Sequence, residues 1–182
     1  SFLLAHPGAR VDTLDVFQET LPDVTPDILA VKYQLLSGAE VDDRIRTAWQ
    51  DIIAHIERFL AADIYLVSCP MWNFSLPYRL KHYIDVILQP RYLFQYTESG
   101  VEGLAKGKKM FVVSTRGGDY GPQSPFHSFD HQEPYLRAVF GFAGITDITF
   151  ITAQPMDALG TGIMKEKLNA ARRLARDIAA KI

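Results

Sequence analysis

Cysteine is nearly absent from this chain of 182 residues, which contains only one, Cys69. A single thiol excludes an intrachain disulfide framework and any metal site that needs several cysteines. One cysteine also fits a reducing compartment, so we expect a cytoplasmic protein.

The chain also lacks a large net charge and long apolar runs. Its net charge is −2 at pH 7, which favours neither nucleic acid nor an anionic membrane as a partner. No apolar run approaches the length of a membrane span, and no signal peptide is visible. Because 48% of the residues are hydrophobic, we expect residues 1–182 to form a single domain around one core.

Sequence signatures of hydrolases, nucleotide hydrolases and metalloenzymes are missing as well. The chain has no G-x-S-x-G elbow and no Walker sequence. Cys69, at the end of a predicted strand, is interpreted as a small buried residue rather than a nucleophile. His127, Asp130 and His131 lie close together in the sequence, but they lack the helical H-E-x-x-H spacing, so we expect no metal site.

The most informative stretch is residues 69–77, between a predicted buried strand at 64–67 and a predicted helix. Ligands of an open α/β sheet bind beyond the carboxyl ends of its strands, where this loop is expected. Its aromatic, amide and thioether side chains suit a flat heteroaromatic ligand with polar edges. The alternative is that Trp72 and Phe74 only fill the core.

A second unusual loop, residues 114–121, follows the apolar run 110–113. It contains Thr115, Arg116 and a pair of glycines, Gly117 and Gly118. Two predicted strands therefore end in loops of uncommon composition.

These two loops resemble those of the FMN-dependent NADH:quinone oxidoreductase or azoreductase family, which has a flavodoxin-like fold. The resemblance covers nearly the whole chain. Further matching stretches are His6-Pro7-Gly8, Val11 to Asp15, Phe94 to Glu98, Gly103-Leu104, Gly107-Lys108-Lys109 and Gly141 to Ile145.

The resemblance and the alternation of strands and helices imply an α/β fold, a doubly wound parallel sheet with helices on both faces. Ser1–Ala5 resembles the end of a helix, and Arg10–Phe17 alternates as a strand does. We therefore expect that the first strand, the phosphate-binding loop and most of the first helix precede the printed sequence.

Hydrophobic periodicity predicts the remaining elements. Helices are expected at 26–36, from 43 to 60, from 78 to 88, at 134–142 and from 161 onward; strands at 64–67, 110–113 and 147–152; a hairpin at 92–100; and a long loop over the crevice at 119–133.

The resemblance further implies that FMN carries the chemistry and that no side chain is catalytic by itself. The residues implied to bind FMN are Met71, Trp72, Asn73, Phe74, Thr115, Arg116, Gly117 and Gly118. Gly117 and Gly118 are expected to offer main-chain N–H donors to the flavin edge. Arg116 has two interpretations: it places positive charge near that edge, or it holds its loop through a surface carboxylate.

NADH or NADPH is the implied electron donor, and a quinone or an azo compound the implied acceptor, in a ping-pong cycle that uses one pocket. Tyr120 and Phe126 are expected on the substrate side of this pocket. The family also implies a homodimer, and the loop at 119–133 is a candidate for contacts across its interface.

Three alternatives remain open from the sequence. A non-enzymatic flavodoxin-type electron carrier is disfavoured by the net charge of −2, because such carriers are usually strongly acidic. A binding or regulatory module of the same fold would show no NAD(P)H turnover. A quinone reductase that uses FAD shares the fold, but chain length and the residues Met71 to Phe74 favour FMN.

Overall fold

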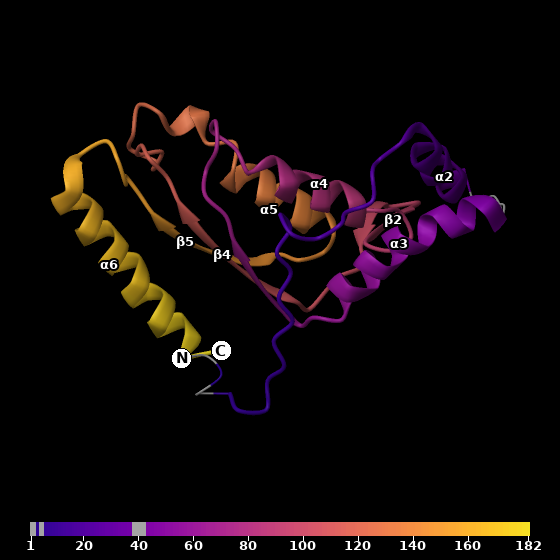
Figure 1. The fold of residues 1–182 in the computed structure, drawn as a ribbon, viewed down its shortest axis with the longest axis horizontal. Coiled ribbons are helices and arrows are strands. Elements are labelled where there is room, and N and C mark those ends of the chain that lie inside the picture. The colour runs from indigo at the N-terminus through magenta and orange to yellow at the C-terminus, as the bar shows by residue number, and fades with distance from the viewer. Residues whose placement is uncertain (1–2, 4–5, 38–42) are drawn as a thin grey trace.

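The computed structural model describes residue 3, residues 6–37 and residues 43–182, without the side chains of residues 35 and 43–48. A sheet of three parallel strands, in the order β1-β4-β5, forms its centre (Figure 1). The strands are β1 (Ile64–Ser68), β4 (Lys109–Thr115) and β5 (Asp147–Ala153). All three run in one direction, so their carboxyl ends meet at one edge of the sheet.

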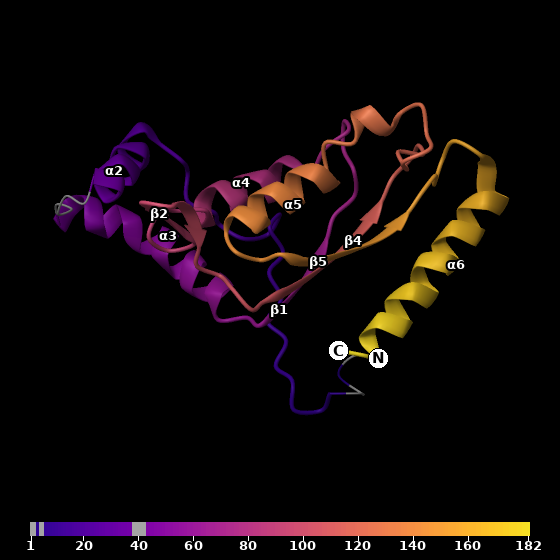
Figure 2. The ribbon, with the colours of Figure 1, turned by 180° about the vertical axis from the view of Figure 1, so that it is seen from behind.

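Helices lie on both sides of this sheet. They are α2 (Pro26–Ser37), α3 (Asp43–Leu60), α4 (Tyr78–Ile87), α5 (Glu133–Phe142) and α6 (Gly160–Ala179), with a short 3-10 helix, η1 (His127–Phe129). Figures 1 and 2 show α3, α4 and α5 on one side of the sheet and α6 on the other. From residue 26 onward the predicted helices, the predicted strands and the parallel sheet are confirmed, with ends that differ by a few residues.

The two faces of the sheet are covered unequally. Tyr65, Met110 and Ile148 are aligned in the register and buried on the face that carries α3, α4 and α5. On this side Phe59 of α3 stacks on Tyr65, with ring centroids 4.3 Å apart. On the other face α6 packs against β5, at the far side of the sheet from β1, so Leu66 of β1 is left 73% exposed. The expected helical cover of this second face is therefore confined to the β5 side.

The prediction of a strand at Arg10–Phe17 is wrong. Residues 10–15 have no regular structure, and a turn begins at Val16. Arginine side chains bind the main chain here, where a neighbouring strand would be needed. Arg58 donates to the carbonyl of Thr13 (3.1 Å), and Arg79 donates to those of Val16 (2.8 Å) and Glu19 (2.6 Å). The predicted helical end at Ser1–Ala5 lies, apart from Leu3, outside the described residues.

The predicted hairpin is confirmed as β2 (Phe94–Thr97) and β3 (Gly100–Gly103). It packs against the carboxyl end of α5, where Ala105 N–H donates to the carbonyl of Ala143 (2.8 Å). Gly144 ends α5 with φ of +100°, a conformation that glycine adopts without strain. Within the described ranges, no helix has the length and hydropathy needed to span a membrane.

Candidate functional site

Two loops meet at the carboxyl edge of the sheet. We call Met71–Phe74, which follows β1, the aromatic loop, and Thr115–Gly118, which ends and follows β4, the glycine loop. Cys69 N–H donates to the carbonyl of Val113 (3.0 Å), and Met71 N–H donates to that of Thr115 (2.9 Å). The ladder between β1 and β4 thus continues into the loops and brings them side by side.

The aromatic loop folds into a tight two-residue turn. Trp72 and Ser75 exchange both main-chain hydrogen bonds, each 2.9 Å long. Asn73 and Phe74, between them, have positive φ angles of 46° and 69°. Two positive φ angles are typical of a type I′ turn, which favours Asn-Gly, so Phe74 occupies a position where glycine would be unstrained. This turn leaves both Trp72 and Phe74 almost half exposed.

Residues 155–158, which follow β5, hold the glycine loop through main-chain hydrogen bonds. The carbonyl of Gly117 accepts hydrogen bonds from the N–H groups of Met156, Asp157 and Ala158. A Cβ on Gly117 would lie 2.9 Å from a carboxylate oxygen of Asp157, and one on Gly118 would lie 3.2 Å from the hydroxyl of Tyr120. The absence of a side chain at Gly117 and Gly118 therefore lets the loop pack closely against Asp157 and Tyr120 of the same chain.

Four main-chain donors at this edge are unused by the part of the chain that the structure describes. The N–H groups of Asn73, Phe74, Gly117 and Gly118 make no hydrogen bond to any residue that the structure describes. Asn73 and Phe74 are exposed and Gly117 and Gly118 half-buried, so their N–H groups can bind water or a ligand. Beside them lie the exposed rings of the aromatic loop. Free donors next to flat apolar surfaces fit the polar rim and the apolar face of a flavin.

Arg116 lies in a buried polar network. Its side chain is 2% exposed, and Nη1 donates to Asp130 (2.8 Å), whose side chain is 6% exposed. Nε donates to the amide oxygen of Gln132 (3.2 Å). Arg116 thus pairs with a carboxylate, as one interpretation holds, but this carboxylate is buried rather than on the surface. The guanidinium thus stabilises its loop, and its Nη2 lies 3.9 Å from a carboxylate oxygen of Glu133 without a hydrogen bond to any described residue.

Aromatic side chains border the loops on the side of residues 119–133. Phe74 contacts Phe129 and Tyr120, with ring centroids 5.3 Å and 6.2 Å away. Phe126, which is 56% exposed, extends this row through Phe129, 6.3 Å away. Tyr120 and Phe126 therefore lie on the same side of the aromatic loop.

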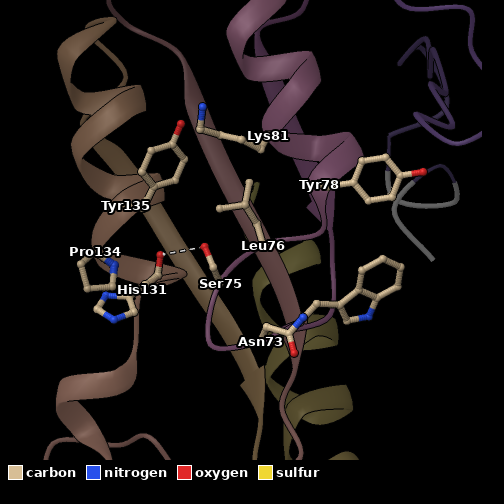
Figure 3. A pocket seen from close by; sticks show the side chains of 9 residues that line it. Asn73, Ser75, Leu76, Tyr78, Lys81, His131, Pro134 and Tyr135 are labelled. Atoms are coloured by element: carbon tan, nitrogen blue, oxygen red, sulfur yellow. Dashed lines mark hydrogen bonds between the residues drawn. The ribbon is translucent and has the colours of Figure 1, made fainter.

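Two cavities adjoin the site. The first, of about 620 Å³, lies between the aromatic loop and the start of α5, and Figure 3 shows its lining. Lys81 lies near Tyr135 here, with Nζ 6.0 Å from the ring centroid. The second, of about 520 Å³, includes Tyr120 and the buried guanidinium of Arg116 in its lining.

Cys69 is buried, as predicted, with 4% of its surface exposed. Burial raises the pKa of its thiol to about 11, so almost none of it is thiolate at neutral pH. We expect iodoacetamide to leave Cys69 of the native protein unmodified at pH 7.5 and to react quickly once the chain is unfolded in guanidinium chloride. Mass spectrometry of the alkylated chain measures this. Equal labelling rates in both states would contradict a buried thiol.

The three residues considered as metal ligands have different surroundings in the structure. His127 Nδ1 contacts the carbonyl of Tyr120 (3.0 Å), and Asp130 binds Arg116. His131 is exposed at the first cavity. Among the described residues, no three His, Cys, Asp or Glu side chains are grouped as metal ligands.

Sequence reasoning missed Gln132 and Asp157. Gln132 lies 16 residues from Arg116 in the chain, and Asp157 follows β5, the third strand of the sheet. No motif marks either residue. The order of the strands gave one signal for Asp157. Because β5 is parallel to β1 and β4, the segment that follows it starts at the same edge of the sheet as the other two loops.

Comparison with known proteins places the whole chain in one family. A family model described as "Flavodoxin-like fold" matches residues 2–178. The FMN-dependent NADH:quinone oxidoreductase of Nitratidesulfovibrio vulgaris (strain DP4) is 37% identical over 96% of this chain and 84% of its own length. The enzyme of that name from Rhizobium meliloti (strain 1021) is 44% identical over 84% of this chain and 72% of its own length.

Solved structures agree with these sequence relatives. An azoreductase from Bacillus anthracis str. Sterne superposes with a TM-score of 0.89 at 26% identity, covering 100% of this chain and 86% of that one. An FMN-dependent NADH-azoreductase from Bacillus anthracis str. Ames Ancestor, in complex with FMN, gives a TM-score of 0.78 at 25% identity, covering 98% and 88%. The chain belongs to the flavodoxin-like family of FMN-dependent NADH:quinone oxidoreductases.

Proposed function

We propose that this protein is an FMN-dependent oxidoreductase that transfers two electrons from NADH or NADPH to quinones or azo compounds. Bound FMN supplies the redox chemistry by taking up and releasing two electrons. The observation that carries the proposal is the set of four N–H donors that bind no described residue, beside exposed aromatic rings, in a chain whose relatives are FMN enzymes.

The protein's own residues bind and orient the flavin in this proposal. Asn73, Phe74, Gly117 and Gly118 present N–H groups to its polar rim, where such donors stabilise negative charge. Met71 and Thr115 place the two loops, through the hydrogen bond between them, and Trp72 supplies a flat side wall. Arg116 acts indirectly, by holding the glycine loop.

The substrate side of the proposed pocket is the aromatic row that contains Tyr120 and Phe126. Both rings lie next to Phe74 or its neighbour Phe129, within reach of a flat molecule stacked on the flavin. A single face that first receives the nicotinamide and then the acceptor leads to ping-pong kinetics. We further propose that the protein is a homodimer, because exposed rings such as Phe126 and Phe129 in the loop at 119–133 are suited to a subunit contact. We also propose that it is cytoplasmic, because a single buried thiol suits a reducing compartment.

The test uses the full-length protein with added FMN under anaerobic conditions. We expect FMN to bind, NADH to bleach its absorbance, and menadione or an azo dye to restore it. Parallel lines in double-reciprocal plots at several acceptor concentrations would support the ping-pong order. Light scattering after gel filtration measures the oligomeric state, for which we expect twice the chain mass.

Two outcomes would contradict the proposal. If FMN binds and neither NADH nor NADPH bleaches its absorbance, the protein is not an NAD(P)H-dependent reductase, and the electron-carrier alternative is favoured. If FMN fails to bind while FAD binds tightly, the cofactor assignment is wrong.

Replacing Phe74 by glycine is expected to weaken FMN binding while leaving the stability of the protein almost unchanged. The release of a strained positive φ offsets the lost ring contacts, so the free energy of unfolding should change by less than about 1 kcal/mol. FMN should bind roughly tenfold more weakly, the effect of losing about 1.4 kcal/mol of ring contact. Denaturant unfolding and FMN titration measure the two quantities.

Tyr96→Ala is the matched control for Phe74→Gly. It removes an exposed ring from β2 and leaves the site intact. A loss of FMN affinity in Tyr96→Ala equal to that in Phe74→Gly would show that the effect is unspecific.

A further inference from the structure

The segment Asp130–Gln132, between η1 and α5, contacts both loops of the site. Gln132 is the centre of these contacts, and none of its surface is exposed. Its amide nitrogen donates to the carbonyl of Pro70 (2.9 Å) and to the sulfur of Cys69 (3.5 Å), the two residues that lead from β1 into the aromatic loop. Its amide oxygen accepts from the hydroxyl of Ser114 (2.7 Å) and from Nε of Arg116 (3.2 Å), at the glycine loop.

The orientation of the Gln132 amide is determined by its partners. A carbonyl oxygen only accepts, so the group facing Pro70 must be the NH₂. The guanidinium of Arg116 only donates, so the group facing it must be the oxygen. The amide therefore bridges the two loops in one direction, and a side chain without both a donor and an acceptor cannot replace it.

The two residues before Gln132 reinforce this bridge. Asp130 binds the guanidinium of Arg116 with one carboxylate oxygen and accepts from Gln132 N–H (2.9 Å) with the other. His131 N–H donates to the carbonyl of Phe74 (2.9 Å), within the tight turn. Figure 3 shows the neighbouring contact between Ser75 and the main chain of His131.

We propose that Gln132 is a positioning residue for the flavin: it holds the aromatic loop and the glycine loop at one separation, so that the free N–H groups of both meet a single ligand. Donors aimed beforehand stabilise charge better than donors that must reorganise, and a buried bridge supplies that rigidity. The inference rests on the proposed function, because it names a residue that prepares the same site.

The test compares Gln132→Met with Gln89→Met. Methionine matches the length of glutamine and removes both the donor and the acceptor. Gln89 is also buried, 2% exposed, but it binds carbonyls within α4, near Pro90 and far along that helix from the site. Both variants lose buried amide hydrogen bonds, but only Gln132→Met removes side-chain bonds that join the β1 and β4 loop segments, and the main-chain bond between Met71 and Thr115 remains in both.

In the absence of FMN, amide hydrogen exchange is the first readout. Met71 N–H and His131 N–H should exchange faster in Gln132→Met than in the wild type, and at the wild-type rate in Gln89→Met. With FMN, we expect the dissociation constant of Gln132→Met to be roughly tenfold higher than that of the wild type, the change that the loss of one good hydrogen bond produces. Its flavin midpoint potential should shift, whereas that of Gln89→Met should not.

The outcomes distinguish this inference from the proposed function. If the wild type fails to bind FMN or to turn over NADH, the proposed function fails, and the exchange data alone decide whether Gln132 joins the loops. If the wild type is active and the two variants show the same exchange, affinity and potential, Gln132 is only a structural residue and the inference is overturned.

Discussion

Replacing Arg116 by methionine is expected to lower the free energy of unfolding by about 3–5 kcal/mol, the usual cost of removing one partner from a buried ion pair. The side chains of Arg116 and Asp130 are 2% and 6% exposed, so water cannot compensate the carboxylate that remains. Gln132 also loses one of its two donors, Nε of Arg116. Guanidinium unfolding followed by circular dichroism measures the change.

The double variant Arg116→Met with Asp130→Asn tests the physical reason. Asparagine keeps the oxygen that accepts from Gln132 N–H and Glu133 N–H, but it carries no charge. Most of the lost stability should therefore return. Arg137→Met is the half-exposed counterpart: it breaks an ion pair with Glu133 and also removes a bond to the carbonyl of Ile148 and a contact with the Phe150 ring, and we expect a loss of about 1 kcal/mol. Equal losses in Arg116→Met and Arg137→Met would refute the role of burial.

Replacing Gly103 by alanine is expected to destabilise the protein by about 3 kcal/mol, near the upper end of overpacking effects. The added Cβ would lie 2.2 Å from the nitrogen of Gly144 and 2.4 Å from the carbonyl carbon of Ala143. Both are main-chain atoms, so no side chain can rotate away. The hairpin of β2 and β3 must therefore move off the end of α5. Denaturant unfolding gives the change in free energy, and crystallography the shift of the hairpin.

Gly141→Ala is the matched control for Gly103→Ala. Among the described residues, no atom outside its own helix and chain neighbours lies within 4 Å of the Cβ that would be added at Gly141, which is inside α5. Alanine is a better helix former than glycine, so stability should rise by up to about 1 kcal/mol. If both variants unfold at the same denaturant concentration as the wild type, the close contact at Gly103 is not rigid.

The helices and strands were predictable because their signals are local. The apolar spacing of Trp49, Ile52 and Ile56 predicts one buried face of α3, and all three side chains are buried at 2% or less. The paired loops were predictable as well, since both follow apolar runs that become neighbouring parallel strands. The assignment of individual flavin contacts stays a prediction.

The segment from Arg10 to Phe17 shows where local pattern fails. Its alternation satisfies the rule for a strand, but a strand also requires a partner main chain. Arg58 and Arg79, distant in sequence, bind its carbonyl groups instead. The partner of Asp130 could not be predicted either, because Arg116 is 14 residues away in the sequence and only the fold brings its guanidinium to this carboxylate.

Periodicity, breaker residues and the composition of the two loops were enough to establish the class of fold, the sheet and the edge that carries the site. Those features depend on neighbours in the chain. Only the tertiary structure revealed the bridge through Gln132 and the contact of Gly103 with Gly144, because each joins groups that are far apart in sequence. Their geometry is decided by packing and by the hydrogen-bonding needs of buried polar groups, which no single stretch of sequence contains.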